Sequence, residues 1–220
     1  MARIYLSVGT GLNDVQEAVV QSLEARIAAA GMSTHTVGRN EFSSDAPLIA
    51  VRSLMDTCDG VIVLALERLR FPEGVERPNS TREKKLGPTS LATPWNQIEA
   101  TLAYERRLPL LVVVDENVRQ DGMLEANNDW YVETIQTTPD QLDKVEFVGR
   151  LRHFASKVKQ RSESASAMVA PKPADNDVAS KAIGEWLRVL TPAQVWTIGS
   201  SIAASIAGAF GAGVWVGGLN

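Results

Sequence analysis

Cysteine is nearly absent from this chain of 220 residues, which contains only one, Cys58. A single cysteine excludes an intramolecular disulfide and fits a protein of the reducing cytosol. Histidine is almost as scarce, and the two histidines, His35 and His153, stand far apart in the sequence. The sequence therefore supports neither a metal site nor a catalytic triad built on histidine.

Basic residues are not in excess, because 22 lysines and arginines face 26 aspartates and glutamates and the formal net charge is -4. A nucleic-acid binder needs a basic face that neutralises phosphates, so we expect no direct binding of nucleic acid. Residues 1–9 contain one arginine and too short an apolar stretch for a secretory signal. We therefore predict no signal peptide.

Charged residues stop abruptly near the C-terminus, since no aspartate, glutamate, lysine or arginine follows Arg188. Earlier in the chain, residues 161–177 contain several serines and prolines and show no hydrophobic period, which is typical of a linker. The sequence thus predicts an α/β domain at 1–160, a linker at 161–177 and a helical tail at 178–220.

The prediction of an α/β domain comes from alternating strand and helix patterns. Ile4, Leu6 and Val8 alternate with Tyr5 and Ser7, as in a strand with two different faces. Later strands are expected at 33–37, 61–66, 109–114 and 130–135, and helices at 14–30, 48–59, 95–107 and 142–154. Because 61–66 and 109–114 are continuously apolar, this order predicts a doubly wound parallel sheet of about five strands.

The ligand site of such a sheet lies at the carboxyl ends of its strands. The first strand ends at Gly9-Thr10-Gly11, where glycine lets the backbone approach a ligand closely. Residues 68–94 are polar and rich in proline, and we expect a mobile lid, a binding loop or a disordered segment there. The charge run at 82–85 is either a solvated part of that loop or a group that closes over an anionic ligand.

The tail contains 24 consecutive uncharged residues, 195–218, and a helix of that length covers the ~30 Å hydrocarbon core of a bilayer. Bulky residues recur every four positions beside a ladder of small residues. The bulky stripe is Ile198, Ile202, Ile206, Phe210 and Val214, and the ladder is Gly199, Ala203, Ala207 and Gly211. Because such ladders let membrane helices pack closely, we expect homo-oligomers to form through this helix.

Trp196 and Trp215 lie near the two ends of the span, where indole rings prefer the membrane interface. Lys181 and Arg188 precede the span, and the positive-inside rule keeps the α/β domain in the cytoplasm, at the inner membrane. The alternative is a buried soluble helix hairpin or an apolar tail packed on the domain, because many glycines weaken a helix. The chain could also stay soluble until it is activated.

Residues 93–104 carry the clearest chemical signal. Glu99 falls about one turn into a helix that begins at the ligand end of the sheet, within reach of the loop after the first strand. Trp95, one turn earlier, could stack on a base or a nicotinamide ring. The alternative is a solvated Glu99 that pairs with Arg106 or a loop lysine, and a Trp95 that only covers the core.

Three segments give a resemblance to known families: Cys58-Asp-Gly-Val-Ile-Val63, Trp95-Asn-Gln-Ile-Glu99 and Arg107-Leu-Pro-Leu-Leu-Val112. In this order they resemble the nucleoside 2-deoxyribosyltransferases and the related TIR-type domains, over roughly residues 3–137. The resemblance implies a flavodoxin/TIR-like fold and attack at the anomeric carbon of an N-glycoside. Glu99 would act as the nucleophile or would stabilise an oxocarbenium-like centre.

The resemblance also implies a ligand, NAD or another nucleotide, and the residues that hold it. The first strand end would bind ribose or phosphate, and the start of the helix would contact the ligand as well. These residues are Ser7, Gly9, Thr10, Gly11, Trp95 and Asn96. No metal is expected among them.

Three functions are compatible with these parts. The favoured one is a bacterial immune effector, of antiphage or abortive-infection type. Its TIR-like domain binds a nucleotide signal or a triggering partner protein, and its tail oligomerises and perturbs membrane lipid. The alternative is an N-glycosidase that hydrolyses NAD or a nucleoside through Glu99. A third interpretation is a tail-anchored subunit whose domain only docks a neighbour.

Overall fold

The computed structural model describes residues 1–169, and the chain divides after Val169 into two units. The main sheet of the first unit has five parallel strands in the order β2-β1-β3-β8-β9. Their bounds are β1 Ala2–Val8, β2 Met32–His35, β3 Gly60–Ala65, β8 Leu110–Asp115 and β9 Tyr131–Ile135. The predicted five-stranded parallel sheet is confirmed, and its strand order is that of flavodoxin-like doubly wound folds.

The predicted membrane helix lies entirely in residues 178–220 and therefore outside the described residues. In the part of the chain that the structure does describe, no helix combines the length and the apolar character needed to cross a bilayer.

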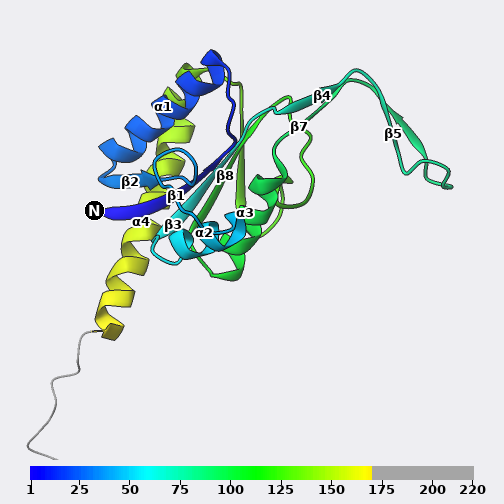
Figure 1. Cartoon of the computed structure of the whole chain (residues 1–220). Helices are drawn as coiled ribbons and strands as arrows, with labels where there is room; N and C mark the ends of the chain where they lie inside the picture. The colour runs from blue at the N-terminus through cyan, green and yellow to red at the C-terminus, as the bar shows by residue number, and fades with distance from the viewer. Residues whose placement is uncertain (170–220) are drawn as a thin grey trace, which may run out of the picture. The chain divides into compact units, whose positions relative to one another are not determined.

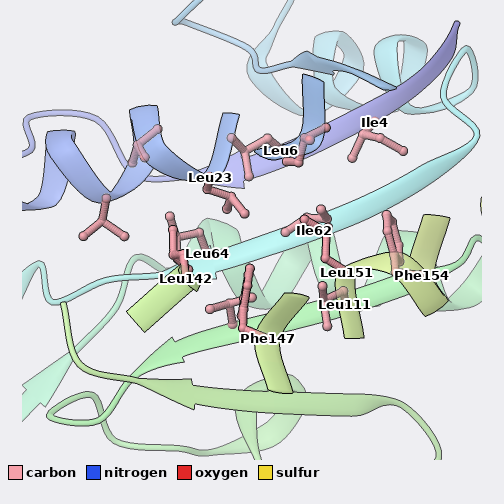
Figure 2. Close-up of a cluster of buried hydrophobic side chains, with 14 of the residues drawn as sticks. Ile4, Leu6, Leu23, Ile62, Leu64, Leu111, Leu142, Phe147, Leu151 and Phe154 are labelled. Carbon is pink, nitrogen blue, oxygen red and sulfur yellow. The ribbon is translucent and has the colours of Figure 1, made fainter. Parts of the chain in front are cut away.

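Two helices cover each face of the sheet (Figure 1). Helices α1 (Asp14–Ala29) and α4 (Val145–Val169) pack on one face, and α2 (Pro47–Met55) and α3 (Pro94–Glu105) pack on the other. A hydrophobic core fills the space between the sheet and each pair of helices. Figure 2 shows the core under α1 and α4, where leucine and isoleucine side chains of the strands meet the phenylalanines of α4. Because both faces of the sheet are covered, β3 is apolar throughout and β8 is apolar up to Asp115.

Strand β1 divides its side chains between the two cores. Ile4 and Leu6 join the core under α1 and α4, whereas Tyr5 joins the core under α2 and α3. Ser7, two residues after Tyr5, lies on that second face and is 1% exposed. The alternation read from the sequence thus places Tyr5 and Ser7 on the side of the sheet that α3 covers.

Helix α4 is longer than the closing helix predicted at 142–154, because it continues to Val169. It packs tightly against β3: a side chain at Gly60 would come within 2.8 Å of Val158 and 3.0 Å of Phe154. The helix extends into the segment expected to be a linker, of which residues 170–177 lie outside the described part.

The segment expected to be a long loop forms a narrow arm of two antiparallel ribbons (Figure 1). One ribbon pairs β4 (Leu69–Phe71) with β7 (Thr89–Leu91), and the other pairs β5 (Gly74–Glu76) with β6 (Lys84–Leu86). The segment is therefore paired rather than disordered, and its role as a mobile lid or a binding loop stays a prediction. Strands of three residues are too short to show a two-residue period, and neighbouring prolines hide them further.

Candidate active site at the carboxyl edge of the sheet

The loop after β1 and the start of α3 meet at the carboxyl edge of the sheet. Thr93 caps α3, and its methyl group is the nearest neighbour that a side chain at Gly9 would meet, at 3.7 Å. Two segments more than 80 residues apart in the sequence therefore form one surface. The end of β1 and the start of α3 meet as predicted, and Ser7 therefore lies close to α3.

Helix α3 buries Asn96, Glu99, Ala100 and Ala103, which recur at helical spacing and form its inner face. The two alanines let the helix lie close to the sheet. The other two residues bring polar groups into a region that is otherwise apolar, and buried polar groups need hydrogen-bond partners.

Glu99 finds its partners on β1. The Tyr5 hydroxyl donates to Glu99 Oε1 at 2.7 Å, and Ser7 is a second side-chain hydrogen-bond partner of the carboxylate. Asn96 Nδ2 donates to Ser7 Oγ at 2.9 Å and so extends the chain of hydrogen bonds. With 7% of its surface exposed, Glu99 is buried rather than solvated.

The surface ion pair considered for Glu99 does not form. Arg106 binds Asp56 instead, with 2.8 Å between Nε and Oδ1. Glu99 is therefore held by neutral donors and has no cationic partner among the described residues.

Asn96 keeps one polar atom without a partner. Its Oδ1 is buried and accepts no hydrogen bond within the described residues. The orientation of the amide is fixed, because Nδ2 also lies 3.3 Å from the Ser7 carbonyl, which can only accept. A buried acceptor without a donor costs free energy, so Asn96 Oδ1 is available to a ligand hydroxyl, a ligand amide or a water molecule.

Burial raises the pKa of Glu99 above the usual value of a glutamate, and the hydrogen bonds from Ser7 and Tyr5 offset part of that rise. The pKa of Tyr5 is also raised, first by burial and then by the nearby charge of Glu99. Tyr5 therefore stays a neutral phenol that donates to the carboxylate. The pair holds a carboxylate that is poorly solvated and fixed in position.

We expect Glu99→Gln to stabilise the fold at alkaline pH. The folded protein binds the Glu99 proton more tightly than the unfolded chain, so wild-type stability falls as pH rises from about 4.5 through the raised pKa. Glutamine keeps an acceptor for Tyr5 and carries no charge, so the variant escapes that loss. Urea unfolding at pH 8 should show the variant to be more stable by roughly 1 kcal/mol.

The same comparison at pH 4 is the control, because a protonated glutamate and a glutamine are then nearly equivalent. An equal difference at both values of pH would contradict a buried, ionising Glu99. Glu105→Gln, at an exposed position of the same helix, should change stability by no more than about 0.5 kcal/mol at either pH.

The glycine turn after β1 borders a small cavity of about 170 Å³, lined by Gly9, Thr10 and Gly11. Gly11 has a φ of +73°, a conformation that glycine adopts without strain. Arg39 lines the same cavity, but Glu17 and Glu24 already bind its guanidinium. Trp95, with 36% of its surface exposed, stands on the first turn of α3.

A second cavity at this edge, of about 200 Å³, holds polar residues that the sequence analysis missed. Glu67 follows β3 and accepts a hydrogen bond from Ser90, which is the main reason that its pKa is lowered. Asp115 ends β8 and accepts hydrogen bonds from Asn117 and Thr137. Both carboxylates could have been found from the sequence, because each directly follows an apolar strand predicted there, at 61–66 and at 109–114.

Within residues 1–169, no group of three or more histidine, cysteine, aspartate or glutamate side chains is placed to hold a metal ion. His35 instead pairs with Glu41, with 2.5 Å between Nδ1 and Oε1. His153 lies on the exposed surface of α4.

No protein-family model and no curated protein matches this sequence. Among solved structures, the chain is similar to a CMP N-glycosidase of Clostridium botulinum, with a TM-score of 0.38 and 12% identity over 69% of this chain and 98% of that one. It is also similar to FerB, a flavoenzyme NAD(P)H:(acceptor) oxidoreductase of Paracoccus denitrificans, with a TM-score of 0.37 and 10% identity over 73% and 99%. At TM-scores this low, neither likeness carries an argument about function. The resemblance to deoxyribosyltransferases and TIR-type domains stays a prediction.

Proposed function

We propose that the α/β domain binds a nucleoside or nucleotide at the carboxyl edge of its sheet and hydrolyses the N-glycosidic bond, with Glu99 as the catalytic carboxylate. The observation that carries this proposal is a buried carboxylate without a cation, held by Tyr5 and Ser7 next to the unpartnered Asn96 Oδ1. A buried carboxylate whose pKa is raised, at the ligand edge of an α/β sheet, is a candidate for a functional site.

In the proposed reaction, the bond between C1′ of the sugar and the base nitrogen breaks, and its electron pair leaves with the base. Positive charge develops on the sugar, and the Glu99 carboxylate either attacks C1′ or stabilises the charge. A water molecule then adds its oxygen to C1′, which breaks the bond to Glu99 where one has formed and frees the carboxylate. One proton of the water goes to the departing base, and the other stays on the new sugar hydroxyl. Tyr5 is a positioning residue that holds the carboxylate, and Asn96 Oδ1 would accept a hydrogen bond from a sugar hydroxyl.

A nucleotide fits the surroundings of Glu99 better than a simple sugar does. The backbone of the β1–α1 turn can approach phosphate or ribose, and the exposed Trp95 ring is available to stack on a base. Glu99 itself lines neither small cavity at this edge. Substrate binding therefore requires the side chains over the carboxylate to move.

The direct test is release of free base by the purified full-length chain. It is incubated with NAD, with purine and pyrimidine nucleosides and with their 5′-monophosphates, and free base or nicotinamide is measured by chromatography. We expect release from at least one of these N-glycosides. Absence of release from the whole panel, by a protein that is folded, would contradict the proposal.

A second function is favoured by one feature of the sequence, the uncharged stretch at 189–220 with its ladder of small residues. We infer that this tail inserts into the inner membrane and self-associates, so that the chain acts as an effector of antiphage type. The α/β domain would then supply the trigger, by binding a nucleotide signal or a partner protein. Charges placed in the middle of the tail test this inference.

A further inference from the structure

A cavity at the amino edge of the sheet lies apart from Glu99. It has a volume of about 910 Å³ and lies among the end of α3, the starts of β8 and β9, and α4. This volume falls in the range of small-molecule sites, whereas the two hollows at the carboxyl edge are smaller.

Three aromatic rings line this cavity, and their polar groups hold each of them in place. Tyr104 donates to Asp129 Oδ2 at 2.5 Å, and Trp130 donates from Nε1 to the Met123 carbonyl at 3.0 Å. The rings of Tyr104 and Trp130 also pack edge to face, with 5.3 Å between their centres. Tyr131, the third ring, donates to Glu133 and lies under the guanidinium of Arg150. Little entropy would be lost when a flat ligand stacks here.

Three cations line the same cavity without a carboxylate partner among the described residues: Arg107, Lys157 and Arg161. The one contact between them is a hydrogen bond from Arg161 Nη1 to the Arg107 carbonyl, at 3.0 Å. Of the two carboxylates in the lining, Glu105 binds Arg106 at 3.6 Å, and Asp129 accepts from the neutral Tyr104 and keeps its charge, so the three cations outnumber it. Three unneutralised cations in one cavity favour an anion.

We infer that this cavity is a second ligand site, for a small anion that carries an aromatic ring, such as a nucleoside phosphate. The base would stack on one ring of the edge-to-face pair Tyr104 and Trp130, and Lys157 and Arg161 would bind the phosphates. Because the site lies at the opposite edge of the sheet from Glu99, it can be occupied while the carboxyl edge is empty. It fits a nucleotide that regulates the domain.

The test is photolabelling of the full-length chain with 8-azido-ADP, followed by tryptic digestion and sequencing of the labelled peptide. Cleavage after Arg119 and Lys144 gives peptide 120–144, which carries Trp130 and Tyr131. We expect label on this peptide at the two aromatic residues, and we expect ADP to compete at a concentration at least about ten times lower than adenosine. Equal competition by adenosine would contradict the role of the cations.

Charge reversal locates the site further. Lys157→Glu with Arg161→Glu should lower labelling of peptide 120–144 by about tenfold. The control, Arg152→Glu, reverses one positive charge at an exposed position of α4 away from the cavity, and it should leave labelling unchanged. Glu99→Gln should leave it unchanged too, so this site can fail independently of the proposed glycosidase. Absence of label from the peptide, or label that survives the charge reversal, would overturn the inference.

Discussion

Glu99→Gln should slow base release from the best N-glycoside substrate by roughly a thousandfold. The reason is electrostatic: an amide neither attacks C1′ nor neutralises the charge that develops there, and burial makes the carboxylate more effective than it would be in water. Glutamine keeps the shape of the side chain and an acceptor for the Tyr5 hydroxyl. The loss should therefore appear in kcat, with a small change in KM.

The matched control for this effect is Glu105→Gln, which makes the same change two turns further along α3. Glu105 is exposed and lies at the amino edge of the sheet, where it pairs with Arg106. Its variant should keep kcat within about twofold of wild type. A Glu99→Gln variant that kept wild-type kcat would exclude Glu99 as the catalytic group, and an equal loss in both variants would point to a general effect on α3.

The second large effect is expected in the tail, for Ile206→Arg combined with Phe210→Arg. We expect the wild-type chain to sediment with membranes and to resist extraction by carbonate. On insertion scales, an arginine near the centre of a span costs about 3 kcal/mol, so two of them reduce the insertion equilibrium by about 10⁴-fold. The variant should move to the soluble fraction.

Ser180→Arg is the control for the tail experiment, because it adds an arginine outside the uncharged stretch. It should sediment with membranes as wild type does. The membrane interpretation fails if the double variant sediments with membranes as wild type does. It also fails if wild type stays in the soluble fraction after incubation with every nucleotide used in the base-release assay.

Most of the α/β architecture could be predicted from local sequence patterns. The apolar run of β3 and the alternation in β1 each follow from which faces of the strand are buried, and this can be read from the strand's own residues. Asn13 caps α1 by accepting from the Gln16 backbone, and an asparagine directly before a helix is a typical N-cap. The arm escaped prediction, because its ribbons are paired across a turn rather than marked by a period of their own.

The site could be predicted only in part, for a physical reason. The sequence singled out Glu99 and Ser7 separately, but the Tyr5 hydrogen bond to Glu99 joins residues 94 positions apart. Its existence depends on how closely α3 approaches β1, which two buried alanines on the helix allow. The unpartnered Asn96 Oδ1 is a property of three-dimensional packing alone. Glu67 and Asp115, in contrast, could have been found by inspecting the residue after each apolar strand.

The most direct test of the central claim is a crystal structure of the Glu99→Gln variant with an intact nucleoside or nucleotide substrate bound. The account predicts that C1′ of the sugar lies within about 3.5 Å of the side-chain oxygen at position 99. It also predicts that a sugar hydroxyl donates to Asn96 Oδ1. A substrate bound at the carboxyl edge with its anomeric carbon turned away from position 99, and with Asn96 Oδ1 still unpartnered, would contradict the account.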